Sequence, residues 1–342
     1  MKETIMKQGR VRLLIIFATS LLLNSCNTNH LSQTPLATKG LIDLQSWDFE
    51  KKGSVLLNGQ WEFYWQKFLA PKDFVFPGNL PKMRVVGVPG NWINTNQVND
   101  TISSLGYGTY RLKIMLPKIV PDKLGLKLPS LRTSGRVFIN GRQVAKVGNP
   151  GTTKSATTPC YQPQVIEVSP DWSELELVIQ VANFHYRKGG IVRSITLGSW
   201  KQVTQSKLRR MLMTMFLVGI MLFAGLYYLG LFGLRRQSKE VLYFACFCLL
   251  VSMRNVAIGE RIILEIFQLP WVIILKMEYL GFYAVIGLFG LFCKEIFPNE
   301  FSSLVVKVYA WITGVISLMV IVTPPLWFSY LLEICQVLSI LG

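Results

Sequence analysis

Residues 211–234 read MLMTMFLVGIMLFAGLYYLGLFGL and contain no Asp, Glu, Lys or Arg. As an α-helix, this stretch would extend roughly 36 Å, which exceeds the ~30 Å hydrocarbon core of a bilayer. A helix satisfies its own backbone hydrogen bonds in lipid, so we predict a transmembrane helix here, with a buried core helix as the alternative. The stretch also divides the chain, because alternating apolar and polar residues precede it and long apolar segments follow it.

The apolar segments after this stretch predict further membrane helices. We expect them at about 241–257, 271–293 and 304–323, with a fifth at 326–342 that is still apolar at the last residue and therefore incomplete. Residues 211–342 would thus form a transmembrane region within the lipid bilayer, and residues 201–210 would connect it to the preceding domain.

The charges at the helix ends predict an orientation. Arg235, Arg236 and Lys239 lie in the short loop after the first helix, and loops rich in Lys and Arg tend to face the cytoplasm. We therefore expect residues 27–210 on the periplasmic or extracellular side of a bacterial inner membrane. A second basic group at the other end of this helix, Lys207, Arg209 and Arg210, runs against the tendency.

The N-terminus has the pattern of an export signal. Basic residues precede the apolar run Leu13–Leu23, as in a secretory signal peptide. The run ends in Leu23-Asn24-Ser25-Cys26, which resembles a bacterial lipobox and implies a signal peptide of residues 1–26 with Cys26 lipidated. Ordinary cleavage and an uncleaved anchor are the alternatives. Residues 27–40 are rich in Ser, Thr, Asn and Pro and lack periodicity, so we expect a tether.

The positive charge lies mainly before the membrane region. Residues 27–210 carry 24 basic and 11 acidic residues, a net charge of +13, whereas residues 211–342 carry a net charge of +1. The basic residues are spread along strands, so we expect no nucleic-acid partner, and a membrane surface or acidic glycans fit better. His, Cys and carboxylate residues form no cluster in the sequence, which predicts neither a metal site nor a cofactor.

Short strands with one buried face are expected in residues 41–200. Apolar residues alternate with others at 61–65, 110–116, 124–128 and 175–181, and this period of two is typical of β-strands. Asn140-Gly141 between two short apolar runs predicts a hairpin, because a type I′ turn needs positive φ at both positions. Many short strands without intervening helices predict an all-β sandwich.

Several sequence motifs in this region carry a resemblance to a known domain. Val88-Pro-Gly-Asn-Trp92, Gly106-Tyr-Gly-Thr-Tyr-Arg111, Val137-Phe-Ile-Asn-Gly141 and Leu177-Val-Ile-Gln-Val-Ala-Asn183 occur in that order. Together they resemble the jelly-roll, galactose-binding-like domain at the N-terminus of glycoside hydrolase family 2 enzymes such as β-galactosidase. The resemblance implies a jelly-roll ectodomain over residues 41–200 with a carbohydrate-like ligand.

Aromatic, amide and guanidinium side chains near the expected strand ends are candidate contacts for such a ligand. The candidates are Asn91, Trp92, Tyr107, Tyr161, Asn183, His185, Tyr186 and Arg187. Sugars stack on aromatic rings and accept hydrogen bonds from amides and guanidinium groups. For Trp92 the alternative is a core position, and for His185 it is an ordinary loop histidine with satisfied hydrogen bonds.

We expect no active site in this chain. The catalytic barrel of the glycosidases is missing, and the few carboxylates of residues 27–210 lie mostly at strand edges and turns, whereas glycoside hydrolysis needs two that flank the scissile bond. The sequence also has neither a nucleophile elbow nor a glycine-rich phosphate loop.

A second resemblance covers the membrane region. Gly230-Leu-Phe-Gly-Leu-Arg-Arg236, Leu242-Tyr-Phe-Ala-Cys-Phe-Cys-Leu249, Met253-Arg254, Gly259-Glu260-Arg261 and Glu278-Tyr279-Leu280 look like the bacterial seven-helix receptors with diverse intracellular signalling modules. In that family an exported β-sandwich precedes seven helices, and a kinase, cyclase or phosphatase output domain follows. This chain shows four full helices, part of a fifth and no output domain, so we expect a C-terminally truncated form.

Charged residues of these motifs form a predicted polar cluster near the outer membrane face. Its members are Arg254, Glu260, Arg261 and Glu278. Charges at membrane depth usually face a partner or water, so the cluster would couple the ectodomain to helix packing, with snorkelling at the interface as the alternative. Two antiparallel helices would bring Arg254 and Glu278 to similar depth, and we expect these two residues to form an ion pair.

The leading hypothesis is a membrane receptor that senses a carbohydrate-like ligand outside the cytoplasm and shifts its helix bundle. The alternative is a membrane-anchored carbohydrate-binding or adhesion module without signalling. Several membrane helices favour the receptor, because one helix or one lipid would suffice as an anchor. A homodimer is compatible with either hypothesis.

Overall fold

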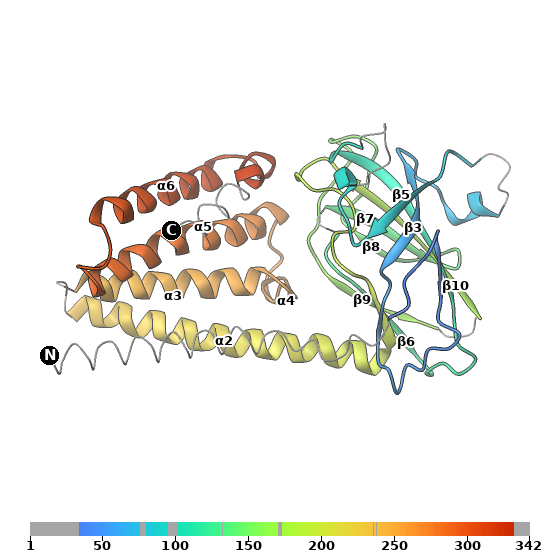
Figure 1. The fold of residues 1–342 in the computed structure, drawn as a ribbon, viewed down its shortest axis with the longest axis horizontal. Helices are drawn as coiled ribbons and strands as arrows, with labels where there is room; N and C mark the ends of the chain where they lie inside the picture. Colours follow the sequence, from blue (N-terminus) through green and yellow to red (C-terminus); the bar gives the residue numbers. More distant parts are fainter. Residues whose placement is uncertain are drawn as a thin grey trace. The chain divides into compact units, whose positions relative to one another are not determined.

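The computed structural model describes residues 34–75, 80–94, 102–131, 133–169, 173–234, 236 and 238–331. The predicted signal peptide, Cys26, most of the tether, Arg235 and residues 332–342 of the fifth predicted helix lie outside these residues. From Pro35 onward the chain forms one compact unit. Strands precede helices along this unit, and Figure 1 shows the two kinds of structure side by side without intermixing.

The strands form two sheets. The larger sheet has the order β4-β3-β5-β10-β7-β8, and β1 pairs in parallel with β5. The smaller sheet has the order β2-β11-β6-β9. The strands are β1 (Leu41–Asp43), β2 (Val55–Leu56), β3 (Gly59–Trp65), β4 (Arg84–Val88), β5 (Gly106–Met115), β6 (Leu124–Leu128), β7 (Ser134–Ile139), β8 (Arg142–Val147), β9 (Gln164–Val168), β10 (Glu174–Asn183) and β11 (Thr196–Ser199). This confirms the predicted all-β sandwich.

The alternation seen in the sequence explains which face of each strand is buried. Trp61 and Phe63 of β3 and Leu112 and Ile114 of β5 lie in one core cluster, together with Leu126 of the smaller sheet. Burial of such side chains contributes about 25 cal/mol per Å² of apolar surface removed from water. Two sheets that each present an apolar face therefore pack against one another.

The β7–β8 hairpin has the expected turn. Asn140 and Gly141 both have positive φ, 45° and 84°. The Asn140 side chain also accepts a hydrogen bond from the Glu176 backbone N–H (2.6 Å), which ties the turn to β10. The turn chemistry thus fixes both the hairpin and its place beside the central strand.

The helix that holds the uncharged stretch is longer than predicted. It is α2, Trp200–Leu234, so residues 201–210 form its first turns and not a separate connector. Ser199 and Gln202 explain its start: the Gln202 N–H donates to Ser199 Oγ (3.3 Å), and the Ser199 N–H donates to Gln202 Oε1 (3.4 Å). This reciprocal pair is a capping box that begins the helix directly after β11.

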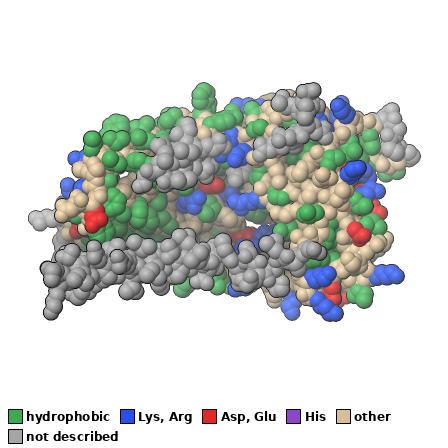
Figure 2. Space-filling model, in the orientation of Figure 1, with side chains coloured by type: hydrophobic (Ala, Val, Ile, Leu, Met, Phe, Trp, Pro, Cys, Tyr) green, Lys and Arg blue, Asp and Glu red, His purple; other side chains and the backbone are tan. Residues whose placement is uncertain are grey.

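The remaining helices follow the apolar segments closely. They are α3 (Lys239–Ala257), the short α4 (Ile263–Ile266), α5 (Trp271–Ile296) and α6 (Ser303–Val322). Of the described helices, α2, α3, α5 and α6 are long and apolar enough to cross a membrane. Figure 2 shows their hydrophobic side chains exposed over a large area, as expected for surfaces that face lipid.

Small residues let neighbouring helices approach closely. A Cβ at Gly225 of α2 would meet Leu249 of α3, and a Cβ at Gly281 of α5 would meet Arg254 of α3. Gly287 of α5 lies equally close to Thr313 of α6. The order α2, α3, α5, α6 is therefore also the order of packing, with each helix against the next.

Candidate functional site

The β-sandwich and the helices share one apolar core cluster. Tyr161 and Tyr186 come from loops of the sandwich, and both side chains are fully buried. They lie in this cluster with Trp271 and Tyr279 of α5 and with Phe328. We call this contact region the junction; it consists of these residues and the charged groups described below.

Asn183 positions Tyr186 at the junction. Asn183 is the last residue of β10, and its Nδ2 donates to the carbonyl oxygens of Ser104 and Tyr186, each at 2.7 Å. Its Oδ1 accepts the Tyr186 backbone N–H (3.1 Å), which closes a tight turn after the strand. The turn directs the Tyr186 hydroxyl to the Tyr279 hydroxyl, and the two oxygens lie 2.6 Å apart.

Arg261 links the sandwich loop that carries Tyr161 to the helices. It follows α3 in a turn that contains Gly259, and both residues have positive φ. Its guanidinium carbon lies 3.4 Å from the centre of the Tyr161 ring, and it donates hydrogen bonds to the Ala257 carbonyl and to Glu278 Oε2 (3.3 Å). A planar guanidinium serves this double role well, because its face stacks while its edge donates.

Glu260 forms a third link. Its Oε1 accepts hydrogen bonds from Lys127 of β6 and from Arg210 of α2, the latter at 2.9 Å. Glu260 and Lys127 are mostly buried. Burial lowers the pKa of Lys127, against the effect of Glu260, which favours the charged ammonium. One carboxylate thus connects the smaller sheet, α2 and the turn after α3.

His185 also lies at the junction. Its ring packs edge-on against Trp271, with 6.2 Å between ring centroids. Its Nδ1 is buried and has no hydrogen-bond partner among the described residues. Burial and the nearby Lys154 lower the pKa of His185, so the neutral imidazole is favoured here.

The prediction of an ion pair between Arg254 and Glu278 is wrong. Glu278 pairs with Arg261, and the guanidinium of Arg254 lies over the ring of Phe282 at 5.6 Å. The reason is the turn after α3, which brings Arg261 back over α5, whereas Arg254 packs its Cβ against Gly281. Arg261 and Glu278 nevertheless meet as members of the predicted polar cluster, and Glu260 lies beside Arg261 in the chain.

The eight candidate ligand contacts do not gather at one place. Tyr161, His185 and Tyr186 contact the helices, and Asn183 supports them. Trp92 is only 1% exposed, and its Nε1 donates to the Tyr110 hydroxyl (2.7 Å) in the sandwich core.

The other three candidates differ in burial. Arg187 is buried, whereas Tyr107 and Asn91 are half-buried, with Tyr107 against the ring of Phe68. None of the fully buried aromatic candidates presents its ring to solvent.

Sequence reasoning did not assign five residues to the junction: Lys127, Arg210, Trp271, Tyr279 and Phe328. Lys127 occupies an outward position of a strand and Arg210 an exposed position of a helix, so each has the pattern of an ordinary surface residue. A tyrosine and a tryptophan near one end of an apolar helix are the usual signs of a membrane interface. Only their contacts across the junction distinguish these residues from ordinary surface residues and from ordinary aromatic residues at a membrane interface.

A cleft lies in the sandwich at the opposite ends of β5 and β10 from Gly106 and Asn183. It has a volume of about 860 Å³ and lies between residues 45–50 and residues 115–121, with Ser173 at its side. Trp47, Phe49 and Leu116 give it an apolar floor, and the carboxylates of Asp48 and Glu50 and the ammonium of Lys118 also line it. An apolar floor with a few polar groups is the usual composition of a small-molecule site.

No group of His, Cys, Asp and Glu residues suited to a metal ion occurs among the described residues. The arrangement described above provides contacts between the β-sandwich and the helices. We identify no set of residues with the geometry of a catalytic centre in the part of the chain described here.

Comparisons with solved structures find partial likenesses to glycosidases. A β-glucuronidase from an uncultured Clostridium sp. is 18% identical with a TM-score of 0.33, and 42% of this chain aligns with 28% of that one. A glycoside hydrolase family 2 β-galacturonidase from Eisenbergiella tayi is 17% identical with a TM-score of 0.29, covering 43% of this chain and 24% of that one. A β-glucuronidase from Ruminococcus gnavus is 16% identical with a TM-score of 0.33, covering 42% and 29%.

This chain thus spans less than a third of the length of these enzymes. No curated protein matches it. The family model described as 7TM diverse intracellular signalling matches residues 210–342, which include α3 to α6 and the whole uncharged stretch of α2, residues 211–234. The chain is therefore a multi-pass membrane protein whose helical region is similar to the 7TM diverse intracellular signalling family, which suggests a membrane receptor or signal transducer.

Proposed function

We propose that this receptor senses a carbohydrate-like ligand with its β-sandwich and passes the binding event to the helices through the junction. The observation that carries the proposal is the apolar cluster that Tyr161 and Tyr186 share with Trp271, Tyr279 and Phe328. A domain that served only as a tethered binding module would need no such contact, because its anchor would suffice to hold it.

Two central strands offer a physical connection between the cleft and the junction. β5 and β10 pair with each other along their whole length, from Met115 and Glu174 at the cleft end to Gly106 and Asn183 at the junction end. Ten residues of extended strand span about 33 Å at about 3.3 Å per residue. A ligand in the cleft can bias the helices only if it binds two arrangements of the junction with different affinity.

The proposed ligand class rests on the resemblance of the sandwich motifs to sugar-binding jelly rolls and on the net positive charge of residues 27–210. The polar groups at the cleft, such as Asp48, Glu50 and Lys118, suit hydroxyl-bearing molecules. We further propose that the sandwich lies outside the cytoplasm of a bacterial cell, because Arg236 and Lys239 lie at the other end of α2. On this proposal the chain itself carries no enzymatic activity.

Hydrogen exchange on the whole chain in lipid nanodiscs tests the proposal. Neutral and acidic oligosaccharides are added as separate panels, and exchange is followed by mass spectrometry. We expect an active sugar to slow exchange at residues 45–50 and 115–121 and to change exchange at Tyr186 and at the start of α5. In Tyr186→Phe the change at the cleft should persist, and the change in α5 should shrink.

Two results would contradict the proposal in different ways. Protection confined to the sandwich in the wild-type chain would indicate a binding or adhesion module without coupling. No protection by any sugar of either panel would reject the carbohydrate-like ligand class.

A further inference from the structure

A groove runs along the first turns of α2, beside the edge of the smaller sheet. Its volume is about 830 Å³. One wall is residues 162–167, which include most of β9, and the other is the face of α2 that carries Trp200, Lys207, Leu208 and Met211. β9 pairs with β6 on one side only and lies at the edge of its sheet. The groove is separate from both the junction core and the cleft.

The position of the groove along α2 relates it to the bilayer. Met211 is the first residue of the uncharged stretch, so the hydrocarbon region begins near it. Lys207 precedes Met211 by four residues, about 6 Å along a helix. The headgroup layer on each side of the hydrocarbon core is about 5–8 Å thick, so Lys207 lies at headgroup depth.

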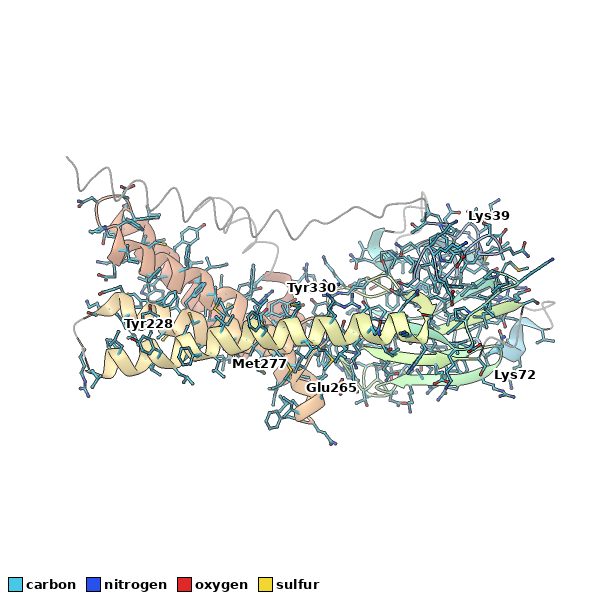
Figure 3. The ribbon with its side chains drawn as sticks, turned by 90° about the horizontal axis from the view of Figure 1, so that it is seen from below. Lys39, Lys72, Tyr228, Glu265, Met277 and Tyr330 are labelled. Atoms are coloured by element: carbon cyan, nitrogen blue, oxygen red, sulfur yellow. The ribbon has the colours of Figure 1, made fainter. Side chains whose placement is uncertain are left out.

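The charges at the mouth of the groove have both signs. Lys207 Nζ lies 3.0 Å from Glu265 Oε1, and both side chains keep some exposure, 27% and 45%. Glu265 belongs to α4 and lies beside α2 at the end of the bundle nearer the sandwich (Figure 3). A zwitterionic phospholipid carries the matching groups, a phosphate for the ammonium and an amine for the carboxylate.

The surfaces below the groove are apolar. Leu208, Leu212 and Met215 follow one another on the same face of α2, and they are 55%, 57% and 48% exposed. Ile266 and Phe267, which directly follow Glu265 in the chain, are also more than half exposed. The acyl chains of a lipid bound at Lys207 would cover these apolar side chains, which is more favourable than exposing the same side chains to water.

We propose that this groove binds the headgroup of a zwitterionic phospholipid from the leaflet nearer the sandwich. The phosphate contacts Lys207, the amine contacts Glu265, and the acyl chains follow Leu208, Leu212 and Met215. The lipid would thereby hold β9 against α2 and the bilayer. This inference does not depend on the ligand of the sandwich.

Photolabelling of the full chain tests the site. Nanodiscs contain phosphatidylethanolamine, a fraction of which carries a diazirine at the start of one acyl chain, and mass spectrometry locates the adducts. We expect adducts on residues 162–167 of the sandwich in addition to residues 207–216. Thr204→Trp fills the groove and should abolish the adducts on residues 162–167 while those at Leu212 and beyond remain.

Controls separate this site from ordinary annular lipid. Gln205→Trp adds the same side chain at an exposed position outside the groove, and it should keep the adducts on residues 162–167. In phosphatidylglycerol nanodiscs with the same photoactive group, labelling of residues 162–167 should fall severalfold, because that lipid has no amine for Glu265. In Glu265→Gln the difference between the two lipids should disappear.

Adducts confined to residues 207–216 and α4 in the wild-type chain would overturn the groove as a lipid site. Equal labelling of residues 162–167 by both lipids would overturn the zwitterionic assignment. If Thr204→Trp lowers the thermal stability of the chain, Glu265→Gln provides the decisive comparison, and an unchanged lipid difference in that variant would contradict the proposal.

Discussion

The hydroxyl pair of Tyr186 and Tyr279 links a loop of the β-sandwich to the membrane helix α5. Each ring is buried, and each oxygen lies beside the other at 2.6 Å. In a buried setting a polar group that loses its partner is costly, because water cannot replace that partner. The pair therefore favours one specific docking of the sandwich loop over slightly shifted ones.

The first prediction concerns this pair. Tyr186→Phe and Tyr279→Phe should each lower the free energy of unfolding by about 0.5–1.5 kcal/mol, the usual contribution of a hydrogen bond. The double variant should cost clearly less than the two single effects added, because one interaction is lost only once. Thermal unfolding of the full chain in nanodiscs measures the cycle.

Tyr107→Phe is the matched control for this cycle. Tyr107 is a half-buried tyrosine of β5 whose ring packs against Phe68, away from the contacts between the sandwich and the helices. Its replacement should leave stability nearly unchanged. Strictly additive effects of Tyr186→Phe and Tyr279→Phe would mean that the two hydroxyls do not interact.

The second prediction concerns His185. Its pKa in the folded chain lies below the ordinary value of 6.5, so the unfolded chain binds more protons in the window below pH 6.5. Stability is therefore fully present above that value and is lost as the pH falls. We expect the wild-type melting temperature to drop below pH 6.5 and His185→Gln to flatten that drop. His30→Gln should keep the wild-type response; an equal flattening in this control would assign the effect elsewhere.

The third prediction replaces the ion pair expected from the sequence. Arg261→Ala and Glu278→Ala should both destabilise the junction, and their combination should recover part of the loss, because a remaining buried charge without its partner is costlier than none. Arg254→Ala combined with Glu278→Ala should give additive effects, since Arg254 contacts Phe282 instead. Recovery in the Arg254 cycle and additivity in the Arg261 cycle would reverse this assignment.

At the scale of single elements, hydrophobic periodicity predicted most of the fold. Strands such as β3, β6 and β10 and the apolar helices follow directly from periods of two and from long uncharged runs. The start of α2 was not predicted because the polar residues Thr204, Gln205 and Ser206 interrupt the apolar periodicity by which an amphipathic helix is recognised. The Ser199-x-x-Gln202 signal was nevertheless present in the sequence.

The junction could not be predicted in the same way. Tyr161, Tyr186 and Tyr279 are far apart in the sequence, and none belongs to a local motif that names its partner. Resemblance to a receptor family identified Arg261 and Glu278 as a polar cluster, but the positive φ of Arg261 decides which pair forms. Local patterns define elements, whereas loop geometry decides the contacts between them.

The fourth prediction concerns the continuity of α2. Ser199→Ala removes the N-cap and should cost about 0.5–2 kcal/mol of local helix stability. Hydrogen exchange of residues 200–206 should become faster, whereas Ser199→Asp, which keeps an acceptor at the cap, should retain slow exchange. Ser206→Ala, an exposed change within the same helix, is the control. Unchanged exchange in Ser199→Ala would show that the helix start does not depend on its cap.

At the scale of the whole molecule, each helix that crosses the membrane takes the chain to the opposite side, so one contact at a helix end fixes which residues share a side. The sandwich contacts one end of the bundle through Glu260, Arg261 and Trp271, so these residues and the sandwich lie on one side. Lys207 and Arg210, which run against the positive-inside tendency, are neutralised at that side by Glu265 and Glu260. Their charge therefore weighs less in the orientation than a simple count suggests.

The last prediction tests this orientation. In a background without the native cysteines, Ser155→Cys places a thiol at an exposed site of the sandwich, and Ser238→Cys places one just before α3 at the other end of the bundle. A membrane-impermeant maleimide should label position 155 in spheroplasts of the bacterial host. It should label position 238 only after the membrane is permeabilised, because α2 crosses the bilayer between the two sites. Labelling of both positions in intact spheroplasts would mean that α2 does not span, and labelling of position 238 alone would mean that the protein is inserted the other way round.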